Sequence, residues 1–231
     1  MATILHIETS TQVCSAAISI DGVIACQLSG EKDNDHAAQL AILTTSLLDT
    51  VSLPAKNLSA VAVSAGPGSY TGLRIGASFA KGLCHALQIP LISINTLLAM
   101  AAGAKDITAT EAILLAPLID ARRMEVYTAL YSSQLECLRK PEAVIMETND
   151  FLSRLTTDKI LFFGSGLQKI KHVLLHPNSI FLDNYQLTAQ DTLTIAWQLF
   201  HQKVFSDISE FEPDYIKPFS GVARLAAESN R

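Results

Sequence analysis

Glycines interrupt the first half of this sequence at positions 66, 68, 72 and 76, directly after a short apolar run. Residues 60–65 have the length and composition of a buried strand, and residues 71–87 have those of a helix. Gly72 and Gly76 would lie inside that helix, where glycine is unfavourable unless another element must come close. The run therefore predicts an α/β unit whose helix starts in a tight turn and packs closely on a neighbour.

The same glycine-rich turn could instead bind a phosphate at the start of the helix. It fails both standard templates, because Leu73 stands where a Walker A loop needs lysine and Thr71 stands where the dinucleotide fingerprint needs its third glycine. We therefore favour a structural loop over a phosphate loop. Its residues are Gly66, Pro67, Gly68, Thr71 and Gly72.

The pattern around the glycine run predicts a mixed sheet with helices on its faces. Asp21-Gly22 lies between two alternating apolar runs, which is a strong hairpin signal, and three meandering strands are followed by alternating helices and strands. Asp35 is the expected cap of the first helix. The other expected elements of this half are strands 4–7, 14–20, 23–28 and 91–94 and helices 36–50 and 96–102.

Residues 103–111 are polar and lack periodicity, so we expect two lobes, 1–104 and 105–231. The second half repeats the theme of the first more loosely, which suggests a duplication. Its expected elements are strands 113–119, 126–131 and 160–163, an extended stretch at 144–146, and helices 150–155 and 188–202.

Composition excludes several functional classes. With 49% hydrophobic and 17% charged residues the chain can bury a core, and a net charge of −5 opposes autonomous nucleic-acid binding. The sequence starts without the basic region of a signal peptide, and its apolar runs are too short to cross a bilayer, so a cytoplasmic protein without a membrane partner is expected. Scattered cysteines predict buried thiols in a reducing compartment: Cys14, Cys26, Cys84 and Cys137.

Three further segments could carry chemistry, each with a plainer alternative. Glu8-Thr9-Ser10 ends the first strand and could hold a metal-bound water and phosphates, although one carboxylate alone cannot build a two-metal site. A polar strand end facing solvent is the alternative. The turn at 120–123 contains two arginines and could recognise phosphate, or it could be a charged turn between strands. His172 and His176 have the spacing of paired metal ligands, but a solvated surface pair is the stronger interpretation.

The two helices of the first half carry more apolar surface than one sheet can cover. On the first, residues 37, 40, 41, 43, 47 and 48 form an apolar stripe of roughly 160°, wider than a surface helix needs. On the second, residues 73–87 are apolar or glycine except for one polar strip, formed by Arg74, Ser78, Lys81 and His85. This surplus of apolar surface predicts that a partner protein or the second lobe packs against the two helices.

Four segments that occur in order along nearly the whole chain resemble the TsaB (YeaZ) family: 7–10, 64–74, 120–127 and 212–216. The glycine-rich segment is the most specific of them. Met124 stands where the family usually has glycine. The resemblance implies an α/β, actin-like, Hsp70-like and sugar-kinase-like (ASKHA) fold of two ribonuclease-H-like lobes, the second smaller and degenerate.

The resemblance also implies a function. Family members help to form N6-threonylcarbamoyladenosine at position 37 of tRNAs that read codons beginning with A. They act as a non-catalytic scaffold that pairs, through its first two helices, with the catalytic subunit TsaD, and a small ATPase, TsaE, joins them. The implied partners are therefore TsaD in a heterodimer, TsaE, and tRNA only through the complex, with a homodimer as the form open to the isolated chain.

The site residues implied are those of a scaffold, without catalytic residues, metal or cofactor. TsaD-like subunits carry an HxxxH motif on this helix, whereas Leu40 stands four residues after His36 here. Glu8, Thr9 and Ser10 are then a vestigial nucleotide cleft. A stand-alone phosphotransferase or peptidase of the same superfamily is the alternative function. The expected partner-binding residues are His36, Leu40, Leu43, Leu47, Arg74, Ala77, Phe79 and Leu83.

Overall fold

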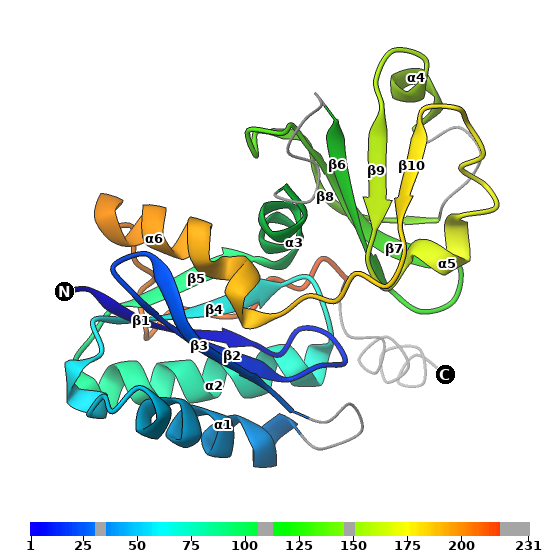
Figure 1. Ribbon diagram of the computed structural model, residues 1–231. Coiled ribbons are helices and arrows are strands. Elements are labelled where there is room, and N and C mark those ends of the chain that lie inside the picture. The colour runs from blue at the N-terminus through cyan, green and yellow to red at the C-terminus, as the bar shows by residue number, and fades with distance from the viewer. Residues whose placement is uncertain (31–35, 106–112, 146–150, 218–231) are drawn as a thin grey trace, which may run out of the picture.

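The computed structural model describes residues 1–30, 36–105, 113–145 and 151–217, and its elements form two five-stranded sheets (Figure 1). The first sheet has the strand order β3-β2-β1-β4-β5. Both pairs among its first three strands are antiparallel, and β4 and β5 are added in parallel. The strands are β1 (Thr3–Glu8), β2 (Ser15–Ile20), β3 (Val23–Ser29), β4 (Ala60–Gly66) and β5 (Leu91–Asn95).

The second sheet repeats this plan strand for strand. Read from β8, its order is β8-β7-β6-β9-β10, with two antiparallel pairs followed by two parallel pairs. The repetition supports a duplication and confirms the expected fold of two ribonuclease-H-like lobes in an actin-like arrangement. The strands are β6 (Leu114–Asp120), β7 (Glu125–Tyr131), β8 (Cys137–Ile145), β9 (Ile160–Phe163) and β10 (Ser179–Leu182).

Helices cover the first sheet on both faces. Helices α1 (His36–Thr50) and α2 (Tyr70–Leu87) lie side by side on one face. On the other face lie α3 (Thr96–Lys105) and α6 (Leu193–Gln202), and α3 also contacts the second sheet (Figure 1). Because α3 packs against both sheets, it is buried nearly all round, which explains its almost wholly apolar sequence. No helix among the described residues is long and apolar enough to cross a membrane.

The C-terminal part of the chain returns to the first lobe, contrary to the expected division at residue 104. The 3-10 helix η3 (Ala189–Thr192) contacts β1 and β2, and α6 contacts β5. Trp197 of α6 lies against Gly22 in the β2–β3 hairpin, and Ser206 pairs with Leu91 of β5. Sequence alone did not reveal this return, because an apolar helix face fits either lobe equally well.

The second lobe departs most from the sequence predictions. The extended stretch expected at 144–146 is a longer strand, β8, which starts at Cys137. The expected helix 150–155 is reduced to α4 (Leu152–Leu155), and residue 150 lies outside the described residues, as does Asp35. Three short elements were not predicted: η1 (Ala55–Asn57), α5 (Leu167–Ile170) and β10. Elements of three or four residues are too short for periodicity to show.

The prediction of buried cysteines holds for two of the four. Cys14 and Cys84 are buried, whereas Cys26 is half-buried and Cys137 is exposed. Cys137 opens β8, the last strand of the second sheet in its strand order, so no further strand covers it. The prediction of a buried thiol is therefore wrong for Cys137.

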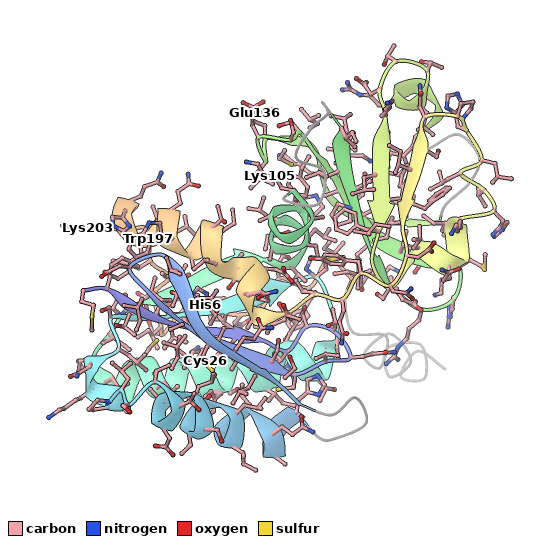
Figure 2. The ribbon with its side chains drawn as sticks, in the orientation of Figure 1. His6, Cys26, Lys105, Glu136, Trp197 and Lys203 are labelled. Carbon is pink, nitrogen blue, oxygen red and sulfur yellow. The ribbon has the colours of Figure 1, made fainter. Side chains whose placement is uncertain are left out.

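His6 ties the returning segment to the middle of the first sheet (Figure 2). Its ring is fully buried, with Nδ1 2.8 Å from the hydroxyl of Thr192 and Nε2 2.8 Å from the hydroxyl of Ser19. Burial lowers the pKa of His6 to about 3, so the ring is neutral at physiological pH. His6 thus joins β1, β2 and η3 by hydrogen bonds without introducing a charge.

Acidification should therefore cost stability through His6. In the unfolded chain His6 is protonated below about pH 6.5, whereas in the folded chain it stays neutral down to about pH 3. Folding therefore becomes less favourable as pH falls through this range. We expect the difference in free energy of unfolding between the wild type and His6→Gln to shrink by about 2 to 3 kcal/mol from pH 7 to pH 4.5. Urea denaturation at both pH values measures it, and a pH-independent difference would contradict the assignment.

Candidate functional site

The glycine-rich turn forms the start of α2. Ser69 caps the helix, and its hydroxyl accepts a hydrogen bond from the backbone N–H of Gly72 at 3.2 Å. Gly66 has φ +115°, a conformation that side chains disfavour, and the Gly66–Pro67 peptide bond is cis. The hydrogen bond between Ser69 and Gly72 therefore joins the end of the turn to the first turn of α2.

The loop after β1 lies directly on this turn and on the first turns of α2. The backbone N–H of Ser69 donates to the carbonyl of Ser10 at 2.7 Å, and the Thr9 hydroxyl donates to the carbonyl of Gly72 at 2.8 Å. A methyl group at Gly72 would collide with the carbonyl oxygen of Thr9, and one at Gly76 with its hydroxyl. These glycines are needed because another part of the chain occupies the space beside the helix.

Glu8, Thr9 and Ser10 are buried and satisfied within the chain. The Glu8 carboxylate accepts hydrogen bonds from the backbone N–H and hydroxyl of Ser10, at 2.6 and 2.5 Å, and from the hydroxyl of Ser64. Burial raises the pKa of Glu8, and the bonds from Ser10 and Ser64 oppose that rise. These three residues are therefore enclosed by the chain, so the solvent-facing alternative is wrong, whereas the vestigial nucleotide cleft stays a prediction.

A groove of about 650 Å³ runs between α1 and α2 on the outer face of the first lobe. Its floor and walls are mainly apolar, with a polar end near the start of α2. Several of its residues belong to the surplus apolar surface noted in the sequence. It is lined by Ala37, Leu40, Tyr70, Thr71, Arg74, Ile75, Ser78 and Phe79.

The expected partner-binding residues divide into two groups. Leu40 and Leu47 of α1 and Ala77 of α2 are buried in the core of their own lobe, so they present little or no surface to a partner. The sequence could not separate them, because each helix carries apolar side chains toward the sheet and outward. The others keep some or most of their surface exposed: His36, Leu43, Arg74, Phe79 and Leu83.

Part of the surplus on α2 is covered by the chain itself. Phe211, in the segment after α6, packs against the core under α2, and its carbonyl accepts a hydrogen bond from Lys81 at 3.0 Å. The exposed side of α2 is the polar strip, where Arg74, Ser78 and His85 face solvent. The apolar surface that α2 leaves uncovered is therefore narrower than the sequence predicted.

Sequence reasoning missed two contributors to this face. Tyr215 reaches α2 from the C-terminal segment: its ring centre is 4.8 Å from that of Tyr70, and Arg74 donates to its hydroxyl at 3.3 Å. The Arg74 guanidinium also lies 4.2 Å from the centre of the Tyr70 ring. Tyr70, which lines the groove, was not among the expected partner-binding residues either.

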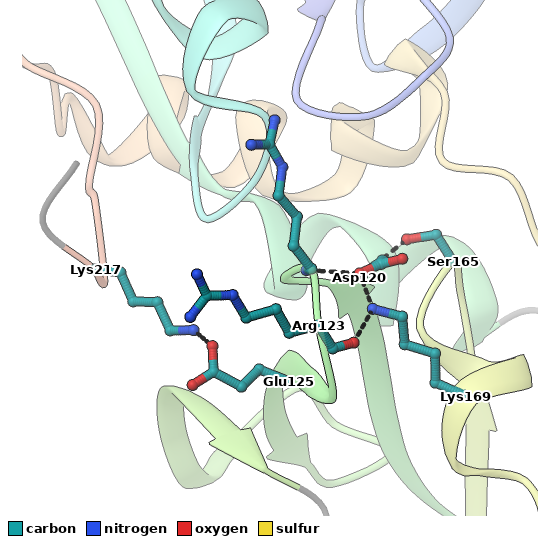
Figure 3. Close-up of polar contacts among 7 residues, drawn as sticks. Asp120, Arg123, Glu125, Ser165, Lys169 and Lys217 are labelled. Carbon is teal, nitrogen blue, oxygen red and sulfur yellow. Dashed lines mark hydrogen bonds and ion pairs between the residues drawn. The ribbon is translucent and has the colours of Figure 1, made fainter. Parts of the chain in front are cut away.

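The turn between β6 and β7 carries the predicted charged cluster (Figure 3). Asp120 accepts hydrogen bonds from the backbone N–H of Arg122 and from Lys169, which also donates to the carbonyl of Arg123 at 2.7 Å. Arg122 and Arg123 have φ values of +66° and +51°, whereas Met124 does not have positive φ. Methionine at the position where the resembling family has glycine therefore causes no strain.

The histidines singled out in the sequence do not converge. Within the described residues no group of three or more His, Cys, Asp or Glu side chains is placed to hold a metal. The Nε2 atom of His36 lies 3.0 Å from the carbonyl of Thr11 and ties α1 to the loop after β1. His172 lies exposed in a turn rather than on a helix, and His176 accepts a hydrogen bond from the backbone N–H of Asn178.

Comparison with known proteins places this fold in one class. The family model for TsaD, tRNA N6-adenosine threonylcarbamoyltransferase, matches residues 30–228. The structure of YeaZ from Pseudomonas aeruginosa superposes with a TM-score of 0.81 at 25% identity, and the match covers 93% of this chain and 100% of that one. The chain thus shares its architecture with proteins of the threonylcarbamoyladenosine system.

Curated relatives narrow the assignment. The tRNA threonylcarbamoyladenosine biosynthesis protein TsaB of Escherichia coli is 30% identical over 225 residues, which cover 93% of this chain and 94% of the relative. The protein of the same name from Bacillus subtilis is 32% identical over 178 residues, covering 74% and 75%. The chain therefore belongs to the TsaB (YeaZ) family.

The glycines of α2 allow a direct test of the close approach. Replacing Gly82 by alanine should stabilise the protein by about 0.5 to 1 kcal/mol, because nothing lies within 4 Å of the new methyl group and alanine favours helix. Gly72→Ala should instead destabilise it by about 2 kcal/mol, because the methyl group collides with the Thr9 carbonyl. Chemical denaturation of both variants measures the two changes in the free energy of unfolding, which should have opposite signs. Stabilisation by Gly72→Ala would show that Thr9 does not approach α2 this closely.

Proposed function

We propose that this protein is a non-catalytic subunit of the machinery that forms N6-threonylcarbamoyladenosine in tRNA, and that it pairs with a TsaD-like catalytic subunit. The observation that carries the pairing is the apolar groove between α1 and α2, which the exposed Ala37 lines from α1. An exposed apolar face on two adjacent helices fits two helices of a partner in a four-helix bundle.

The contacts that the loop after β1 makes within the chain support a scaffold rather than a phosphotransferase. Glu8 is buried and bonded to Ser10 and Ser64, and glycines of α2 lie against Thr9, so the residues that would grip a phosphate are occupied by the chain. His36 is bonded to a backbone carbonyl. A solved structure titled as similar to peptidase YEAZ shares 24% identity and the fold alone, and it adds no support for the peptidase alternative.

The proposal extends to the other partners and to the location. A TsaE-like ATPase joins the pair, and tRNA binds only to the assembled complex, because a net charge of −5 leaves the isolated chain few cations for a phosphate backbone. Without its partner the same apolar face would pair two copies of the chain. Such a complex works in the cytoplasm, where tRNA is modified, and this subunit needs neither metal nor cofactor.

Depletion of the protein in its own cell tests the function itself. We expect the threonylcarbamoyladenosine content of total tRNA, measured by nucleoside mass spectrometry, to fall and to recover when the wild-type gene is supplied. An unchanged content after complete depletion would contradict the proposed function.

Paired substitutions at two exposed positions test the partner face. Ala37 lines the groove from α1 and is exposed, and Leu175 is 78% exposed in the second lobe, so glutamate at either position should leave folding intact. We expect Ala37→Glu to weaken binding of the TsaD-like subunit at least tenfold, because it buries a charge at the interface, and Leu175→Glu to leave it unchanged. Calorimetric titration of the two purified subunits measures both affinities.

Ser78→Glu is an independent second variant, because Ser78 lines the groove from α2 and is also exposed. Substitutions at Leu43 or Leu83 are less informative, because both side chains also pack against the lobe's own core. If Ala37→Glu and Ser78→Glu both bind the partner like the wild type, the partner face lies elsewhere on the molecule.

A further inference from the structure

The turn between β6 and β7 holds two adjacent arginines in a conformation that arginine disfavours. Arg122 and Arg123 both have positive φ, and both side chains are exposed. Left-handed backbone at residues other than glycine costs free energy, and it persists only where the surroundings impose it. Here Asp120 accepts from the N–H of Arg122, and Lys169 donates to the carbonyl of Arg123, so the turn is held from both sides.

The acidic groups around the turn are already paired with lysines. Lys169 forms an ion pair with Asp120, and Lys217, from the C-terminal segment, forms one with Glu125 (Figure 3). Neither guanidinium makes a hydrogen bond or ion pair with the part of the chain that the structure describes. Burial and then the charge of Arg123 lower the pKa of Lys217, which is consistent with an excess of positive charge at this spot.

We propose that Arg122 and Arg123 form a contact for the phosphate backbone of tRNA, presented by this subunit within the assembled complex. This inference rests on the proposed function, which brings tRNA to the complex. Guanidinium groups bind phosphate oxygens with paired hydrogen bonds, and two of them fixed on one rigid turn can contact neighbouring phosphates.

The proposed function favours a nucleic-acid phosphate over a small anion, because it brings tRNA to the complex. Both arginines are exposed, and the groove between α1 and α2 lies elsewhere. Contacts of this kind with phosphate oxygens position a nucleic acid without reading its bases. The C-terminal segment also links this turn to the partner face, because Lys217 contacts Glu125 two residues after Tyr215 contacts Arg74.

The double variant Arg122→Gln/Arg123→Gln tests the inference against a matched control, Lys140→Gln/Lys203→Gln. The control removes the same charge from exposed lysines on β8 and at the end of α6. The complex with the TsaD-like subunit and transcribed tRNA is titrated by fluorescence anisotropy between low and physiological salt. We expect the arginine variant to bind on the order of tenfold more weakly and its salt slope to fall by about two, with the control close to the wild type.

Turnover separates this inference from the proposed function. If the wild-type complex modifies tRNA, we expect the arginine variant to raise KM for tRNA with kcat retained, and excess inorganic phosphate to compete only weakly. A KM and salt slope equal to those of the control would overturn the phosphate contact. So would loss of subunit association in the arginine variant, which would assign the turn to an acidic surface of the protein partner. If the wild-type complex is itself inactive, the proposed function fails, while the low-salt binding comparison still decides the phosphate contact.

Discussion

The approach of the Thr9–Ser10 backbone to the start of α2 determines much of the first lobe. Ser69 donates to Ser10 and Thr9 donates to Gly72, so the end of β1 is bonded directly to the helix that β4 precedes. That contact sets the distance of α2 from the sheet. Because α1 lies beside α2, the width of the groove between the two helices depends on the same contact.

The C-terminal segment is the second constraint, because it makes the two lobes one structure. After the second sheet the chain returns through η3, whose Thr192 meets the buried ring of His6. It then crosses β5 at Ser206 and reaches the glycine turn, where the backbone N–H of Asp214 donates to the carbonyl of Ala65 at 2.6 Å. A segment that contacts both the core and the proposed partner face couples the fold of the lobe to the shape of its outer surface.

The fold could be predicted from the sequence wherever local chemistry determines it. The Asp21-Gly22 hairpin is formed with positive φ at both residues, as a two-residue hairpin turn requires. The strands and helices of the first half lie within a few residues of their predicted bounds, because each is long and bounded by glycine, proline or a cap. The return of α6 could not be predicted, because it depends on contacts between residues more than a hundred positions apart, such as His6 and Thr192.

The candidate site was only partly predictable, for a related reason. Periodicity shows how much of a helix is apolar but not which apolar side chains face inward. Leu40 and Phe79 could therefore not be distinguished, although both line the groove and only Phe79 keeps part of its surface exposed. Tyr215 lies far from α2 in sequence and carries no periodic signal. Contacts of this kind become visible only when the whole chain is folded.

The two sheets share one topology, yet their first turns have opposite electrostatic character. In the first lobe the turn after β1 follows Glu8, which is buried against hydroxyl groups and whose pKa is raised by burial. In the second lobe the corresponding turn after β6 is exposed, and its acidic groups are paired with lysines while its arginines face solvent. The Glu8 carboxylate is thus enclosed by hydrogen bonds within the chain. The duplicated plan therefore leaves two exposed arginines on the second turn, in a chain whose net charge is negative.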